Sequence, residues 1–414
     1  MISFPRSVAL VGLVLIAGLA LAAGEAVAQG SVKIGLLAPL TGPFAAIGRD
    51  LVAGTEIYLD EIGRQVAGRK IELIVDDSEG NPNVALTKAR KLVEQDKVHL
   101  LTGGVLASVG YALHPYAEAQ KIPTTYPVTA PDDLTQRKLS KWVVRTGFNS
   151  SQSLHPFGEW VARNLKFKRV VAIGMDYAFG WEIVGGFQRS FEENGGQIIQ
   201  KIWSPLPTTD FAPFLAQIKR DADGVFALYA GRPAIQFAKQ YQDAGLKARL
   251  PLVGGGTLTD EAVLPAMGDE ALGIISPLHY SAALETPANR RFVAAFQQKA
   301  GKVASHGAEL AYSGARWIVE AIKAIDGKVE DRERFLAALR KVEIKDAPRG
   351  PISVDSYGNP VQNIYVRKVE RVEGKLQNTV IHTFPAVSQF WKYSPEEYLK
   401  LPLYARDYPP CKHC

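Results

Sequence analysis

Cysteine is nearly absent from the sequence: the chain of 414 residues contains two, Cys411 and Cys414, both within its last four positions. A disulfide framework therefore cannot hold the fold together, and a large hydrophobic core has to do so. Long basic runs are missing as well. The 48 Lys and Arg residues are interspersed with 42 Asp and Glu residues and leave a net charge of +6. We therefore do not expect nucleic acid as a partner.

The usual signatures of catalysis and nucleotide binding are also missing. No G-x-G-x-x-G motif follows a predicted strand, no Lys-Ser/Thr follows a glycine-rich loop, and no G-x-S-x-G elbow occurs. The seven histidines are scattered. His306 and Glu309 are three residues apart, which suits one face of a helix, but such a pair is more typical of a solvated surface than of a metal site. We expect no cofactor and no metal, and no residue stands out as catalytic.

One apolar run is present, at the N-terminus. Residues 8–23 follow the positive charge of Arg6, and Ala26-Val27-Ala28 has the small-x-small pattern of a signal-peptidase site. The run is shorter than the roughly 20 residues that a membrane-spanning helix needs. We expect residues 1–28 to be a signal peptide, cleaved after about Ala28, and the mature protein to be soluble and exported.

The two cysteines are compatible with export and suggest little about function. In an oxidising compartment Cys411 and Cys414 can close a small local disulfide, or they can hold a metal weakly together with His413. We expect this Cys-Lys-His-Cys motif to be an ornament of a surface tail.

Short apolar runs and stretches with helical spacing alternate along the rest of the chain. Alternation of this kind predicts βαβ units around parallel sheets, and its restart after about residue 170 predicts two α/β lobes. The predicted strands lie at 32–37, 71–75, 98–101, 170–174, 198–202, 225–229 and 251–254. The predicted helices lie at 48–65, 82–95, 108–120, 181–194, 211–220, 233–244, 286–300, 309–325 and 331–341, and β-like segments follow at 364–372 and 376–384.

Ligands of open α/β sheets bind at the carboxyl ends of the strands, so the loops that follow the strands are the candidate site. The loop 102–108 follows a predicted strand and opens a helix. Its free backbone N–H groups and the Ser108 hydroxyl can face an anion. Ser108 can equally be a plain helix cap.

Several short motifs lie in these loops in a particular order and spacing. By them the chain resembles the branched-chain amino-acid type of solute-binding proteins of ABC transporters, over about residues 32–341. The motifs are Ile34-Gly35 before Pro39-Leu40-Thr41-Gly42-Pro43, Asp76-Asp77 before Asn81-Pro82, Pro127-Val128-Thr129-Ala130 before Leu134-Thr135, and Tyr177-Ala178-Phe179-Gly180.

The resemblance implies an α/β type I periplasmic binding fold, with two doubly wound parallel-sheet lobes joined by a three-strand hinge and closing on a small ligand. It also implies a periplasmic location and an ABC permease in the inner membrane as partner. We expect the N-terminal lobe to comprise 29–147 and 282–348 and the C-terminal lobe 148–281 and 349–384. The chain should cross between them near 145–149, 276–281 and 350–359. The tail, 385–414, is longer than the family pattern.

The resemblance further implies the ligand site, position by position. Leu106, Ala107 and Ser108 would hold a ligand carboxylate, with Thr129 and Ala130 from the next loop. Family aromatics are absent at Ile47 and Gly231, Phe179 keeps the ring without a hydroxyl, and Gly256 stands where an acidic residue pairs with a ligand ammonium. The further residues that we expect near the ligand are Phe44, Tyr229, Arg232, Thr257 and Tyr280.

These departures predict the ligand class. An ammonium buried between two lobes needs a carboxylate or several acceptors to offset its desolvation, and these positions supply none. Arg232 can clamp a carboxylate, unless it lies at the surface. We expect a small carboxylate without an α-amino group, with aromatic acids favoured. The alternatives are branched-chain amino acids or amides and, in another class, an enzyme or ligand sensor on the same scaffold.

Overall fold

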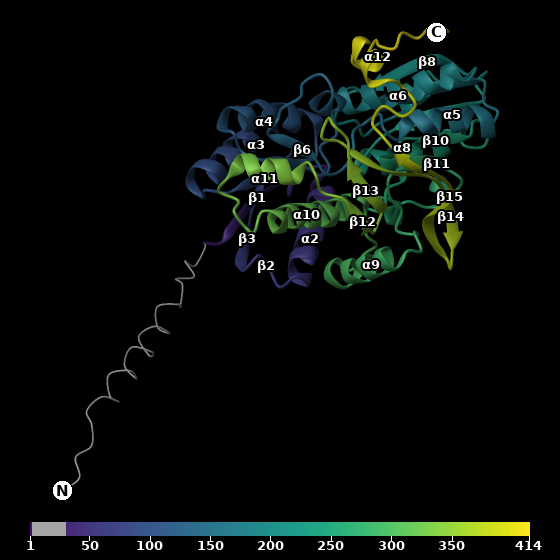
Figure 1. Ribbon diagram of the computed structural model, residues 1–414. Coiled ribbons are helices and arrows are strands. Elements are labelled where there is room, and N and C mark those ends of the chain that lie inside the picture. Colours follow the sequence, from purple (N-terminus) through teal and green to yellow (C-terminus); the bar gives the residue numbers. More distant parts are fainter. Residues whose placement is uncertain (2–29) are drawn as a thin grey trace.

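The computed structural model describes Met1 and residues 30–414. The predicted signal peptide thus lies almost entirely outside the described residues. Within the described part of the chain, no helix combines the length and the apolar character needed to cross a membrane. Figure 1 shows the described residues as two α/β lobes side by side.

The first lobe is built on a six-stranded sheet, in which β1 lies between β3 and β4 and the chain winds outward in both directions. All neighbouring strands are parallel except the short β2, which pairs antiparallel with β3. The order across the sheet is β2 (Gln65–Val66), β3 (Arg69–Asp77), β1 (Val32–Ala38), β4 (Leu100–Gly103), β5 (Thr124–Tyr126) and β6 (Val143–Arg145).

Helices cover both faces of this sheet. On one face α3 (Pro82–Arg90) packs against α4 (Ala107–Gln120), and on the other α2 (Ala45–Glu61) packs against α10 (His306–Ala324). The side chains of β1 alternate between these layers, as side chains of a strand must: Leu37 packs among residues of α3 and α4, and Ile34 among residues of α2 and α10. The other helices of this lobe are α9 (Pro287–Ala300) and α11 (Arg332–Leu339).

The second lobe is built on a nine-stranded sheet. Its strands β7 to β11 are parallel, whereas β12 to β15 join antiparallel at one side. The order is β12 (Ile344–Ala347), β13 (Gly350–Val354), β14 (Pro360–Val372), β11 (Ile275–Leu278), β10 (Leu252–Gly254), β9 (Gly224–Leu228), β7 (Arg169–Met175) and β8 (Gln197–Ser204), with β15 (Lys375–Val387) paired to β14. The helices are α5 (Leu154–Asn164), α6 (Ala178–Glu193), α7 (Ala212–Leu215) and α8 (Arg232–Asp243).

One predicted helix is wrong in its extent. The sequence predicts a helix over 211–220, but α7 has only four residues. After Leu215 the chain continues in tighter turns, in which the N–H of Gln217 donates to Phe214 O and that of Ile218 donates to Leu215 O. These bonds span three residues instead of four, so the α-helix ends there.

The chain passes between the lobes three times, after β6, after β11 and after α11. The third passage lies upstream of the expected 350–359, because the chain already joins the second sheet at β12. Ile344 of β12 and Ile352 of β13 pair in that sheet, yet both pack in the core of the first lobe. The strands β12 and β13 therefore belong to the hinge. They are hydrogen-bonded within the sheet of the second lobe and packed in the core of the first lobe.

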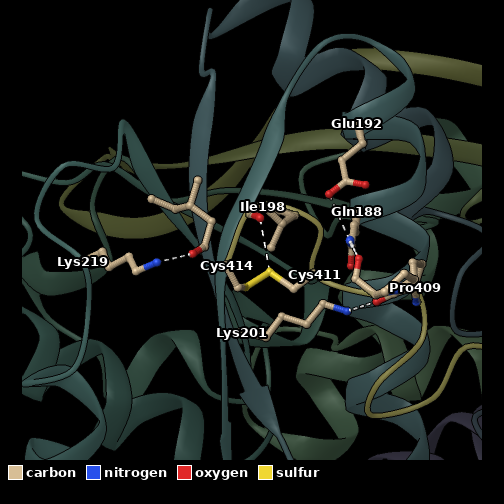
Figure 2. Close-up of a disulfide and its surroundings, with 10 residues drawn as sticks. Gln188, Glu192, Ile198, Lys201, Lys219, Pro409, Cys411 and Cys414 are labelled. Carbon is tan, nitrogen blue, oxygen red and sulfur yellow. Dashed lines mark hydrogen bonds between the residues drawn. A yellow bond between two sulfur atoms is a disulfide. The ribbon is translucent and has the colours of Figure 1, made fainter.

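The C-terminal tail, for which the sequence predicts no particular role, is a packed part of the fold. Tyr398 of α12 (Pro395–Lys400) and Tyr404 are buried, and Tyr404 lies where a Cβ on Gly185 of α6 would come within 2.6 Å of its ring. Cys411 and Cys414 form a disulfide, and Cys411 Sγ lies 3.3 Å from the carbonyl oxygen of Ile198 in β8 (Figure 2). Lys201 and Gln188 donate to the neighbouring carbonyls of Pro409 and Pro410.

Candidate ligand-binding site

A cavity lies between the lobes, at the carboxyl ends of the parallel strands. The space not filled by protein atoms amounts to about 420 Å³, including solvent at its mouth. Both lobes and one passage between them contribute to its walls, which are mainly apolar. The lining residues are Phe44, Val105, Leu106, Ala107, Val128, Ala130, Phe148, Tyr177, Phe179, Ala230, Thr257 and His306.

One wall is the start of α4. Gly103 and Gly104 have φ of +109° and +76°, and the chain turns sharply there, with Gly104 N–H donating to Leu37 O at 2.7 Å. A Cβ on Gly103 would lie 2.1 Å from that same oxygen, so only glycine fits. Leu106 is the N-cap without a side-chain cap, which leaves the first N–H groups of α4, beginning with Ala107, as donors at the cavity.

The wall from the second lobe is the start of α6 and two strand ends. Tyr177 and Phe179 place their ring centroids 6.2 Å apart, and Ala230 and Thr257 follow β9 and β10. The Thr257 hydroxyl donates to Tyr229 O at 2.9 Å, so its hydrogen is already used. This wall therefore offers aromatic surface and the phenol oxygen of Tyr177, whose pKa burial raises above its ordinary value.

The third wall joins the first passage between the lobes to the start of α10. Phe148 comes from the passage, and His306 is the first residue of α10, whose N-cap Ser305 accepts from Ala308 N–H. His306 Nδ1 lies 2.7 Å from Asp260 Oδ2, and both residues are buried. Burial by itself would lower the pKa of His306, but the Asp260 carboxylate outweighs this and holds the pKa above its ordinary value.

The imidazolium acts on its partner in return. Burial would raise the pKa of Asp260, but His306 holds it well below the ordinary range. The structure thus places a buried ion pair beside an otherwise apolar cavity, with Asp260 already engaged by His306.

Six residues singled out in the sequence line this cavity together. They come from three loops of the first lobe and two of the second: Phe44, Leu106, Ala107, Ala130, Phe179 and Thr257. The eight others lie outside its lining: Ile47, Ser108, Thr129, Tyr229, Gly231, Arg232, Gly256 and Tyr280.

The two tyrosines of this second group are core residues. Tyr229 packs between Phe211 and Phe237, with ring centroids 4.8 and 4.5 Å away, and its hydroxyl pairs with Ser204. Tyr280 is fully buried beside Phe292. Tyr229 thus packs in the core of the second lobe, and Tyr280 packs in a cluster with residues of α2, α9 and α10.

The remaining residues of this group also lie outside the lining. Thr129 is buried against Gly110 of α4, Ile47 against Gly307 of α10, and the carbonyl of Gly256 accepts from Arg367. Ser108 and Arg232 are exposed at the starts of α4 and α8. The guanidinium of Arg232 therefore does not line the cavity as the expected carboxylate clamp.

Six lining residues were missed as site residues. They are Val105, Val128, Phe148, Tyr177, Ala230 and His306. Val128 and Tyr177 belong to the motifs Pro127-Val128-Thr129-Ala130 and Tyr177-Ala178-Phe179-Gly180, so the sequence already indicates this region. His306 was interpreted as part of a solvated helix face with Glu309. Instead Glu309 is buried and pairs with Arg349 at 2.8 Å, while His306 turns to Asp260. Among Met1 and residues 30–414, no group of three or more His, Cys, Asp and Glu could hold a metal ion.

Comparison with known proteins agrees with the two-lobed fold described above. The profile of the family described as periplasmic binding protein matches residues 31–375. The "Leu/Ile/Val-binding protein homolog 6" of Brucella melitensis is 33% identical over 365 residues, which are 85% of this chain and 91% of the relative.

Two solved structures of ABC-transporter solute-binding proteins are also similar. One, from Rhodopseudomonas palustris BisB5 in complex with 3,4-dihydroxybenzoic acid, is 35% identical with a TM-score of 0.83 and covers 87% of this chain and 98% of that one. The other, from Rhodopseudomonas palustris HaA2 in complex with p-hydroxybenzoic acid, is 32% identical with a TM-score of 0.83 and the same coverage.

Proposed function

We propose a ligand class for this chain, which belongs to the periplasmic binding protein family and is a solute-binding protein of the ABC-transporter type. The ligand is a small aromatic carboxylate, held between the two lobes when they close. The chain delivers this ligand to an ABC permease in the inner membrane after export and removal of residues 1–28.

The observation that carries this proposal is the charge of the cavity lining. None of its lining residues is an aspartate or glutamate, and Asp260, the carboxylate next to it, is already engaged by His306. An α-amino acid would bring an ammonium that finds no free carboxylate in this lining to offset its desolvation. A ligand without that group avoids the cost.

The remaining groups suit an aromatic acid. The N–H groups at the start of α4 favour a carboxylate, since the helix dipole adds to their hydrogen bonds. Phe44, Phe148, Tyr177 and Phe179 supply aromatic surface for a flat ring. Two similar proteins of known structure hold 3,4-dihydroxybenzoic acid and p-hydroxybenzoic acid.

Branched-chain amino acids are the second candidate, because the Brucella melitensis relative carries Leu/Ile/Val binding in its name. They share the carboxylate and the apolar body with the first candidate. They differ in the ammonium, which makes the two classes easy to separate by experiment.

Thermal unfolding with a set of carboxylates and amino acids tests the proposal. A ligand present at 100 times its Kd stabilises the folded protein by about 2.7 kcal/mol, which raises the Tm by a readily measured amount. We expect benzoates and hydroxycinnamates to raise the Tm and leucine, isoleucine and valine to leave it unchanged. The opposite pattern would contradict the proposal.

Two further measurements separate the other classes of function. The stabilising acid should be recovered unchanged by NMR after long incubation with the protein, since we propose a receptor; a converted product would indicate an enzyme. The mature chain from a periplasmic fraction should begin at about Gln29 by N-terminal sequencing.

A further inference from the structure

We propose that His306 is a specificity-determining residue that donates a hydrogen bond from Nε2 to a second oxygen substituent on the ring of the bound acid. This inference rests on the proposed function, because it takes an aromatic acid with its carboxylate at the start of α4. It adds a preference: hydroxy-substituted benzoates over benzoate itself.

The orientation of the imidazole is fixed by Asp260. Asp260 Oδ2 accepts both from His306 Nδ1, at 2.7 Å, and from the backbone N–H of His306, at 3.1 Å. The other carboxylate oxygen accepts from Ala262 N–H at 2.9 Å, which holds Asp260 itself in place. Because Nδ1 is hydrogen-bonded to Asp260, Nε2 is the ring nitrogen of His306 that remains for a ligand, and His306 lines the cavity.

The charge of the pair makes Nε2 a donor. Asp260 keeps His306 as the imidazolium, in which both ring nitrogens carry hydrogen. His306 is only 1% exposed, so this N–H has little access to water. A hydrogen bond from this charged donor to an acceptor on the ligand therefore contributes strongly to the binding free energy, because the cavity is otherwise apolar.

The ligand carboxylate at α4 is badly placed to be that acceptor. The first lobe carries α3 and α4 on one face of its sheet and α2 and α10 on the other, and in Figure 1 the first pair lies above β1 and the second pair below it. The start of α4 and His306 at the start of α10 therefore flank the sheet edge from opposite faces. A ring lying across this edge presents its carboxylate to α4 and a substituent on its far side to His306.

The ring surface around His306 supports the same arrangement. The rings of Phe148, His306 and a second histidine, His279, contact one another, with centroids 6.2 Å apart for Phe148 and His306, 4.8 Å for Phe148 and His279, and 6.0 Å for the two histidines. Burial holds the pKa of His279 well below its ordinary value, so that ring is neutral. The one cationic donor of this wall that lines the cavity is thus His306, among the residues that the structure describes.

Calorimetry with benzoate and 4-hydroxybenzoate tests the inference. Both acids offer the same carboxylate and ring, and only the second offers a further oxygen. Since a hydrogen bond to a charged group has a large effect on binding, we expect the wild type to prefer 4-hydroxybenzoate by about ten- to hundredfold. The test variant is His306→Phe combined with Asp260→Asn, which avoids a buried carboxylate without its partner and keeps an acceptor for Ala262 N–H.

In this double variant the ratio of the two Kd values should fall close to one, because 4-hydroxybenzoate loses a hydrogen bond that benzoate does not make and therefore loses more affinity than benzoate does. The control is His382→Gln, an exposed histidine on β15, which should keep the wild-type ratio. In the unmodified protein, the Nε2–H signal of His306 in a ¹H–¹⁵N spectrum should shift with 4-hydroxybenzoate and much less with benzoate. This second measurement does not depend on how the variant folds.

Equal affinity of the wild type for both acids, or an unchanged ratio in the double variant, would overturn the role of His306 and leave the proposed function standing. A loss of affinity for both acids alike would also overturn it, because His306 would then act on the common carboxylate. If none of the aromatic acids binds the wild type, both this inference and the proposed function are wrong.

Discussion

Gly231 faces Phe44 across the cleft: a Cβ built on Gly231 would lie 3.2 Å from the carbonyl oxygen of Pro43 and 3.6 Å from the ring of Phe44. Gly231 precedes α8 in the second lobe, and Phe44 precedes α2 in the first. The lobes therefore touch at a position where a larger side chain would hold them apart. Gly231 also has φ of +62°, a conformation that favours glycine.

The first prediction follows from this contact. Gly231→Leu should prevent full closure and weaken the binding of 4-hydroxybenzoate at least tenfold, because affinity depends on the contacts of the closed state. In solution scattering, the wild type should shrink on adding this acid, whereas the variant should not.

The matched control is Gly245→Leu at the other end of α8. Gly245 has φ of +68° but nothing within 4 Å of its Cβ position. This variant should lower the free energy of unfolding by about 1–2 kcal/mol through backbone strain and leave ligand affinity unchanged. Wild-type affinity and shrinkage in Gly231→Leu would argue against closure at this contact.

The second prediction concerns the aromatic wall. Phe179→Ala removes a ring that lines the cavity and should weaken binding of aromatic acids by about 1–3 kcal/mol, or roughly ten- to hundredfold. Phe214→Ala on α7 removes the same side chain away from the cavity and should bind like the wild type. Calorimetry measures the affinity of the two variants for aromatic acids. Equal affinities would show that Phe179 does not contact the ligand.

The third prediction concerns stability against pH. Burial raises the pKa of Asp132 to about 6, above its unfolded value of 3.8, in a cluster with Glu182, Arg145 and Arg137. Folding therefore favours the protonated carboxyl: this contribution is complete below about pH 3.8 and is lost as the pH rises through 6. The pKa difference corresponds to about 3 kcal/mol of lost stability at pH 8.

Asp132→Asn removes this ionisation and keeps an oxygen for Ser151 N–H, which Asp132 Oδ1 accepts at 3.0 Å. The variant should be more stable than the wild type at pH 8 by up to about 3 kcal/mol, with the gain vanishing near pH 4. Denaturant unfolding at several pH values measures it. A loss of stability that grows as the pH rises from 4 to 8 would contradict the prediction, because it would show that the ionised carboxylate stabilises the fold.

The fourth prediction concerns the disulfide. Cys411 and Cys414 close a loop of four residues, so replacing both by serine should cost at most about 2 kcal/mol in the free energy of unfolding. The disulfide lies against β8 and not in the lining of the cavity, so ligand affinity should stay as in the wild type. A large change in affinity would mean that the tail takes part in closure.

The fold was predictable because its signals are local. Apolar runs such as 32–37 and 71–75 became β1 and β3, and the glycines and prolines after them mark the loops. The extent of α7 and the place where the chain joins the second sheet could not be predicted. Just after α7, Gln217 and Lys219 hydrogen-bond to Gln200 of β8 in addition to the local turns, and β12 joins the sheet by pairing with β13.

The site was predictable only in part, for a related reason. Ala107 and Phe179 stand next to strand ends, so sequence position alone brought them to the cavity. Tyr229 also follows a strand, but one step in β register turns its ring into the core, and the sequence does not show that step. His306 reaches the cavity only because α10 packs on α2, far away in the chain.

The central claim is that the ligand is an aromatic acid without an ammonium group. Titration calorimetry of the mature protein with 4-hydroxybenzoate and a hydroxycinnamate, beside leucine, isoleucine and valine, tests it most directly. We predict micromolar or tighter binding of an aromatic acid and no measurable heat from the three amino acids. Micromolar or tighter binding of an aliphatic amino acid, with both aromatic acids silent, would contradict the account.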